Sequence, residues 1–130
     1  MILVVAIVVI ISGFSYPFLT RYMLSNNLAL TEDKLISSIR KAQINAMSGK
    51  DNEDWGVCIF NNEIRLYSNM CLEPHSFQDY SLFGSVEAIG DFDVTFSQRG
   101  EPLEIDSVTL RTRIDETIIS INAVGGINAD

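Results

Sequence analysis

Residues 1–19 read MILVVAIVVIISGFSYPFL, and none of these side chains is charged. As an α-helix this stretch extends about 29 Å, close to the thickness of the apolar core of a bilayer, about 30 Å. A cleaved signal peptide needs a basic segment before the apolar run and a small-residue cleavage motif after it, and neither is present. A buried core helix is also unsuitable, because a small head cannot cover an apolar rod on every side. The stretch therefore predicts a membrane-spanning anchor.

The helical pattern continues beyond this anchor, but apolar residues then occupy only one face. Their spacing of seven, four, three and four residues is typical of a helix that packs against a domain. This head-packing face consists of Leu28, Leu35, Ile39, Ala42 and Ala46. Ser48 and Gly49 provide a stop signal, so we expect one helix through Met47 with a length of about 70 Å.

Two residues within the apolar stretch are poor helix formers. Gly13 has a low helix propensity, and Pro17 lacks an N–H group and clashes with the preceding turn. We expect a helix break at these positions, as a kink or an unwound stretch. Neighbouring helices can supply partners for the freed carbonyl groups, so such a break fits a packed helix bundle, although it fits a single kinked span equally well.

The rest of the sequence predicts short strands and turns. Residues 55–60 and 63–68 flank Asn61 and Asn62, which tolerate the backbone conformation of a tight hairpin turn. Further strands are expected at residues 85–89, 92–96, 107–112 and 117–124. Apart from the first of these, residues 69–90 read as a loop.

The predicted fold class is therefore α+β, with a long N-terminal helix packed against a small antiparallel sheet of four to six strands. The chain divides into an apolar membrane or filament-core helix at residues 1–24, its amphipathic continuation at 25–49 and a β-rich head at 50–130. A length of 130 residues suits a single head. The net charge of −8 argues against nucleic-acid binding, which needs a basic surface.

The order of these features resembles the type IV pilins and the pseudopilins of type II secretion. Residues 1–13 followed by Pro17 look like the apolar helix of that superfamily, and the head looks most like the H-type minor pseudopilin and related minor pilins. The other segments that carry the resemblance are residues 35–46, 55–59, 94–100 and 119–127. The resemblance covers nearly the whole chain, and each head segment by itself is weakly specific.

This resemblance implies a structural subunit of a filament that assembles through its N-terminal helix. The expected partners are other pilin or pseudopilin subunits, an inner-membrane platform protein with its ATPase, and membrane lipid before assembly. The chain would wait in the inner membrane as a single-pass protein with its head outside the cytoplasm. After assembly it would belong to a periplasmic or extracellular filament, either a pilus or a secretion pseudopilus.

One departure from the family concerns the residues ahead of the apolar run. The prepilin-peptidase site, a glycine followed by phenylalanine, and the glutamate just before the run do not precede Met1. We expect that the sequence is truncated there; a genuine start at Met1 would put processing and N-methylation in doubt. In the family this carboxylate pairs with a neighbouring subunit's N-terminus, so a chain that starts at Met1 should assemble poorly.

The two cysteines, Cys58 and Cys71, suggest a disulfide in a head outside the cytoplasm. Closing the short loop between them would stabilise the head by about 3 kcal/mol. The alternative is a pair of reduced cysteines packed as small apolar residues. A metal site would need more ligands than these two.

The sequence predicts no catalytic, cofactor-binding or metal-binding residues. His75 is the only histidine, and it lies in an expected loop where a histidine is normally just solvated. A nucleophile elbow, a phosphate loop and paired metal-ligand motifs are lacking. The acidic residues of segment 51–54 do not match the spacing of a helix-loop-helix calcium site. We therefore expect a structural protein without a cofactor, and not an enzyme.

A membrane-tethered extracytoplasmic binding module is the alternative function. Residues 69–90 would then form its binding loop, whose apolar side chains either contact a ligand or, as we favour, pack onto the sheet. These side chains are Phe77, Tyr80, Leu82 and Phe83. A pilus subunit for adhesion or DNA uptake shares the same architecture. A basic patch for DNA would consist of Arg99, Arg111 and Arg113, but we favour ordinary solvated arginines, and the acidic composition counts against DNA.

Overall fold

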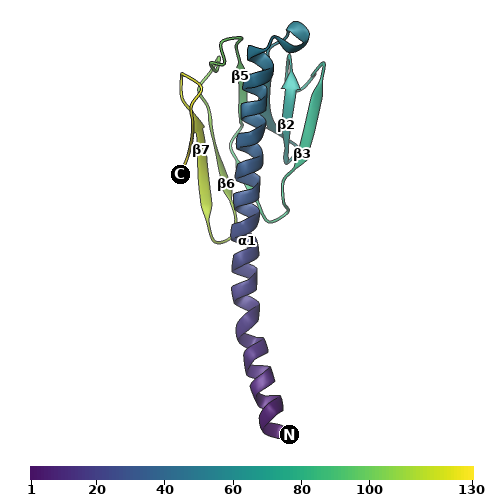
Figure 1. Ribbon diagram of the computed structural model, residues 1–130, viewed down its shortest axis with the longest axis vertical. Coiled ribbons are helices and arrows are strands. Elements are labelled where there is room, and N and C mark those ends of the chain that lie inside the picture. Colours follow the sequence, from purple (N-terminus) through teal and green to yellow (C-terminus); the bar gives the residue numbers. More distant parts are fainter.

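The computed structural model describes residues 1–130 and consists of one long helix and a β head. Helix α1 runs from Ile2 to Met47, and its second half lies along the head while its first half projects away from it (Figure 1). The expected α+β fold, with a long N-terminal helix against antiparallel strands, is confirmed.

The end of α1 agrees with the sequence prediction. Ser48 caps the helix, and its N–H donates to the Ile44 carbonyl at 2.9 Å. Gly49 then adopts a left-handed backbone with φ of 66°, which glycine reaches without steric cost. A short 3₁₀ turn, η1 (Lys50–Asn52), leads from there into the first strand.

The first sheet is built around the predicted hairpin. β1 (Trp55–Phe60) and β2 (Glu63–Ser68) pair antiparallel, and Asn61 and Asn62 between them have φ of 49° and 58°. Two successive left-handed residues are the requirement of a type I′ turn, which asparagine meets. β3 (Phe77–Ser81) and β5 (Asp93–Phe96) extend this hairpin into a four-stranded antiparallel sheet of order β3-β2-β1-β5.

A second four-stranded sheet lies beside the first along the helix. Its strands are β4 (Glu87–Ile89), β6 (Ser107–Arg111), β7 (Glu116–Ile121) and β8 (Ile127–Ala129), in the order β4-β6-β7-β8. All neighbouring strands are antiparallel. The turn between β6 and β7 lies at the end of the head from which α1 projects (Figure 1).

The expectation of a single unit of four to six strands was therefore wrong in number and arrangement, because eight strands form two sheets. β3 falls inside the segment 69–90 that reads as loop. Its residues are all exposed or half-buried, so it lacks the apolar alternation that marks a strand. β8 has only three residues and is defined by its pairing with β7.

Both sheets pack on the same face of α1. The helix contacts β1, β2 and β5 of the first sheet and β6 and β7 of the second. Strand residues that alternate inward complete one core with the helix; they include Val57, Leu66, Val94, Leu110 and Ile119. The helix is thus the central element of the head core, so its direction fixes how the apolar half leaves the head.

Candidate functional site

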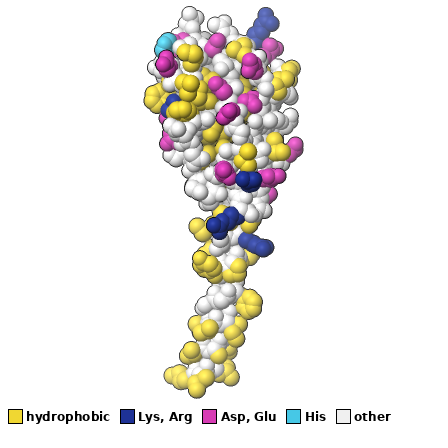
Figure 2. All heavy atoms as spheres, turned by 180° about the vertical axis from the view of Figure 1, so that it is seen from behind, with side chains coloured by type: hydrophobic (Ala, Val, Ile, Leu, Met, Phe, Trp, Pro, Cys, Tyr) yellow, Lys and Arg dark blue, Asp and Glu magenta, His cyan; other side chains and the backbone are white.

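The N-terminal half of α1 is the most unusual surface of the molecule. Every residue from 1 to 23 is exposed, although most of them are apolar. Figure 2 shows this part as a narrow rod covered with hydrophobic side chains below a head rich in carboxylates. The helix is long and apolar enough to cross a membrane. A surface of this kind is stable only in lipid or against other apolar surfaces.

Hydroxyl groups within the rod are already satisfied by the helix itself. Ser12 donates to the Val8 carbonyl at 2.7 Å, and Ser15 donates to the Ile11 carbonyl at 3.0 Å. The Thr20 hydroxyl likewise donates to the Tyr16 carbonyl, one turn earlier in the helix, at 3.1 Å. These bonds remove the cost of placing an unpaired hydroxyl in an apolar medium. The small polar residues are therefore compatible with burial in lipid or in a helix bundle.

The predicted helix break at Gly13 and Pro17 is not observed as an interruption. α1 is helical from end to end, with Pro17 inside it. Proline has no N–H to donate, so the helix lacks one hydrogen bond at this position. The N-terminal half curves gently in Figure 1, so the chain absorbs both residues without unwinding.

The C-terminal half of α1 holds the head. The structure buries all five residues of the head-packing face, namely Leu28, Leu35, Ile39, Ala42 and Ala46. Gln43 adds a polar clamp that the apolar pattern did not indicate, since its side-chain amide donates to the Gly100 carbonyl at 3.2 Å and to the Gly125 carbonyl at 2.8 Å. In the sequence, the sign of this contact with the head was the position of Gln43 next to Ala42, at the margin of the apolar face.

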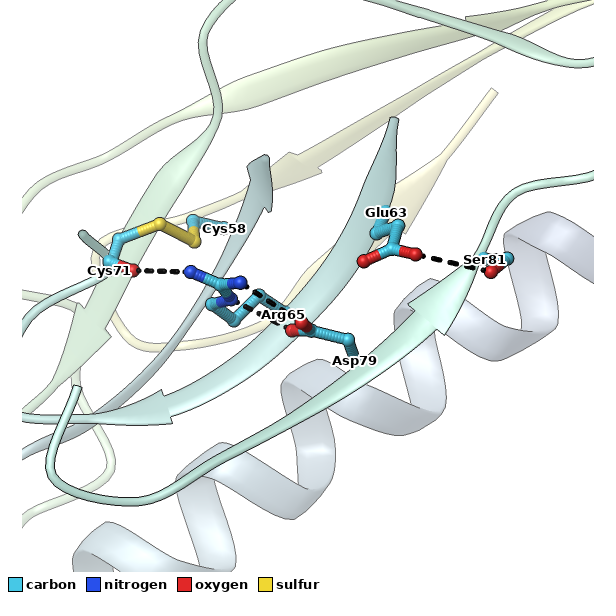
Figure 3. A network of polar contacts seen from close by, with 6 residues as sticks. All are labelled: Cys58, Glu63, Arg65, Cys71, Asp79 and Ser81. Carbon is cyan, nitrogen blue, oxygen red and sulfur yellow. Dashed lines mark hydrogen bonds and ion pairs between the residues drawn. A yellow bond between two sulfur atoms is a disulfide. The ribbon is translucent and has the colours of Figure 1, made fainter. Parts of the chain in front are cut away.

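The disulfide expected in the head is present. Cys58 of β1 is bonded to Cys71, which lies in the connection between β2 and β3. Figure 3 shows that Arg65 of β2 lies beside this bond and points toward Asp79 of β3. The guanidinium group also donates to the Cys71 carbonyl at 3.1 Å. The disulfide and Arg65 therefore fix the same loop over the outer face of the first sheet.

A second polar cluster lies on the same outer face. The Tyr67 side chain crosses Gly56, and its hydroxyl contacts the Asp93 carboxylate and, at 2.8 Å, the Thr95 hydroxyl. Burial raises the pKa of Tyr67, and burial likewise raises the pKa of Asp93. The sequence did not indicate this cluster, because it depends on the register that sets β1 between β2 and β5.

His75 contacts another titratable group in the head. Its Nδ1 lies against the carboxylate of Glu53, and this hydrogen bond lowers the pKa of Glu53. A candidate general base would also need a nucleophile or a substrate cleft within reach. No group of three or more His, Cys, Asp or Glu side chains is arranged to hold a metal ion.

The apolar side chains of segment 69–90 are divided between packing and exposure. Leu82 is buried in the core and Tyr80 packs partly against it, with Lys34 of α1 at 3.8 Å from the Tyr80 ring centre. Phe77 is 57% exposed and Phe83 is 43% exposed. Packing thus accounts for Leu82 and part of Tyr80, while both phenylalanines remain largely on the surface.

Comparison of the chain with protein-family models, curated proteins and solved structures gave no match. A function for this protein is therefore inferred from the geometry of the chain itself. It combines an exposed apolar half-helix with a firmly held, disulfide-bonded β head.

Proposed function

We propose that this protein is a structural subunit of a type IV pilus or type II secretion pseudopilus, which assembles through α1. The observation that carries the proposal is the contrast between the two halves of one continuous helix. Residues 1–23 are exposed and nearly all uncharged, whereas the later half buries one face against the head. A monomer leaves this apolar surface unsatisfied in water, and stacked helices or lipid would cover it.

The shape of α1 supports the same proposal. A helix of 46 residues is about 69 Å long, and its free part is the length of a membrane span. Subunits that wait in a membrane and then pack their helices into a fibre would use one surface for both states. The head would face outward, away from the axis of the fibre.

Site-specific photocrosslinking in cell membranes tests this assembly. We expect a photoreactive residue at Val9, on the exposed helix, to yield a ladder of covalent multimers. The same residue at Val124, exposed on the head, is the matched control and should yield fewer crosslinks. Monomers alone from the Val9 position would contradict assembly through α1.

A groove favours the second candidate, a membrane-tethered binding module. This groove of about 480 Å³ lies between α1 and β3 and is lined by Leu30, Lys34, Tyr80 and Phe83, among others. Its lining is mostly apolar and carries one positive and one negative side chain, Lys34 and Asp79, so it suits a mainly apolar ligand. Replacing Phe83 with serine separates the two functions: a binding module would lose its ligand, whereas a filament subunit would keep its helix crosslinks.

A further inference from the structure

Three arginines gather at the base of the head, where α1 leaves it. Arg21 is the only charged residue of α1 before Glu32. Arg111 ends β6, and Arg113 lies in the turn that follows. Both of these arginines line a groove of about 730 Å³ that is also lined by Thr20 and Leu24 of α1. The β6–β7 turn therefore lies beside the residues that end the apolar stretch.

The three arginines differ in their partners. Arg111 pairs with the Glu87 carboxylate at 3.2 Å and lies opposite Glu116 in the β6–β7 register, so its charge is balanced locally. Arg113 and Arg21 are exposed and form no ion pair. The nearest acidic neighbour in the turn, Asp115, uses its carboxylate to accept the Glu116 N–H at 2.9 Å. Arg21 and Arg113 are thus not held in ion pairs, while Asp115 and Glu116 of the same turn keep their negative charges.

These charges lie at one end of an otherwise acidic head. In Figure 2 the lowest charged groups are dark blue, directly above the hydrophobic rod, and the carboxylates lie higher on the head. The whole chain carries a net charge of −8, so an anionic surface would repel most of the head. At the base, three arginines offset the charges of Glu87, Asp115 and Glu116, so this part of the head repels such a surface least.

We propose that Arg21 and Arg113 bind the phosphate groups of anionic lipids, so that the base of the head rests on the membrane surface. The continuity of the site with the apolar helix identifies the occupant, because a helix inserted through residues 1–19 places Arg21 at the level of the headgroups. Tyr16 and Tyr22 are exposed on either side of this level, where tyrosine is favoured at membrane interfaces.

Two contacts on separate elements would also orient the head. A single contact at Arg21 lets the head rotate about the helix axis, whereas a second contact at Arg113 ties one side of the head to the lipid surface. Ile114, exposed beside Arg113, would point into the interfacial region as an apolar neighbour of this contact. Packing into a fibre would require the release of both lipid contacts.

Fluorescence quenching in reconstituted vesicles tests the proposal on the full chain. A fluorophore attached at Gly84→Cys reports on the groove, because this exposed position has no neighbour within 4 Å of an added Cβ. Non-reducing labelling leaves the Cys58–Cys71 bond intact. We expect stronger quenching by headgroup-labelled lipid in vesicles that contain phosphatidylglycerol than in pure phosphatidylcholine. Arg113→Gln should lower the ratio of docked to undocked heads about fivefold.

Arg99→Gln is the matched control, because Arg99 precedes Gly100, which lies against Met47 at the opposite end of the head. It should leave the quenching unchanged. Inorganic phosphate added to neutral vesicles should not reproduce the effect of the anionic lipid. Equal quenching in both lipids, an equal effect of the two arginine variants, or a full effect of free phosphate would each overturn the proposal.

This inference rests on one part of the proposed function, the insertion of α1 into the membrane. It does not depend on filament assembly. Flotation of the chain with vesicles measures insertion separately. A chain that floats but shows no dependence on Arg113 would contradict the lipid site alone. A chain that does not float would contradict the anchor, and with it both proposals.

Discussion

Arg65 and Asp79 form a two-point ion pair between β2 and β3, with Nε–Oδ1 at 2.8 Å and Nη2–Oδ2 at 3.0 Å. The two residues are direct partners in the strand register. Their side chains are only 14% and 23% exposed, and the guanidinium group lies within 5.0 Å of the ring centres of Phe60 and Phe77. The hydrogen bonds to Asp79 raise the pKa of Arg65. This pair holds the edge strand β3 onto the hairpin.

Replacing Arg65 with lysine should lower the free energy of unfolding by about 2 kcal/mol, because lysine keeps the charge but cannot form the planar two-point contact. Urea unfolding of the full chain in detergent measures this change, with the fluorescence of Trp55, the single buried tryptophan, as reporter. Arg111→Lys is the control: its pair with Glu87 is 51% and 68% exposed and should contribute about 0.5 kcal/mol or less. Equal losses in the two variants would contradict a special role for Arg65.

Reduction of the Cys58–Cys71 bond should lower the free energy of unfolding by about 3 kcal/mol. The bond closes a loop with a sequence separation of 13, and the chain-entropy model assigns about this stabilisation to such a loop. Unfolding curves with and without reductant measure the change. The double variant Cys58→Ala and Cys71→Ala should match the reduced protein, and it should no longer respond to reductant. An unchanged midpoint in the reduced protein would contradict the prediction.

Replacing Gly56 with alanine should destabilise the head by about 2 kcal/mol, in the range found for overpacked cores. An added Cβ would lie 2.5 Å from the Val94 carbonyl oxygen and 2.6 Å from the Tyr67 hydroxyl, so the sheet or the tyrosine must move. Gly84→Ala is the control, since no atom lies within 4 Å of its added Cβ. Thermal unfolding followed by circular dichroism compares the two. Similar transition temperatures for both variants would show that the close approach at Gly56 is easily relieved.

Local sequence signals were sufficient for the parts of the fold that short-range chemistry determines. The apolar spacing from Leu28 to Ala46 defined the buried face of α1, Gly49 defined its end, and Asn61 and Asn62 defined the first turn. Each of these features follows from residues within a few positions of one another. They could therefore be read without knowledge of the tertiary structure.

The polar clusters could not be predicted in the same way, because they depend on pairing between distant segments. Arg65 lies between Ile64 and Leu66, and the alternation of this strand indicates only that its side chain points away from the core. Its contact with Asp79 requires β3, a strand that the sequence pattern did not reveal. At Pro17 the local propensity did not unwind the chain, and α1 stays helical through this residue.

The stability of the head should depend on pH through Asp93. Burial raises the pKa of Asp93 above its ordinary value of 3.8, the hydrogen bond from Tyr67 opposes this shift, and the nearby charges of Asp106 and Glu104 add to it. The folded state therefore binds this proton more tightly than the unfolded state does. The contribution of Asp93 to stability is greatest below pH 3.8 and falls as the pH rises through the folded-state pKa.

Asp93→Asn removes this titration and keeps an oxygen that can accept from Tyr67. The difference in unfolding free energy, variant minus native, should therefore increase from acidic to neutral pH. Glu53 has the opposite pH dependence, because its pKa is lowered in the folded state and its contribution to stability is lost as the pH falls. The native protein and the Asp93→Asn variant both contain Glu53, so its contribution cancels in the difference between their unfolding free energies. Tyr67→Phe should steepen the decline of stability with pH, since it removes the hydrogen bond that favours the ionised carboxylate. Urea unfolding across this pH range measures both effects, and a difference that stays constant with pH would show that Asp93 titrates alike in the folded and unfolded states.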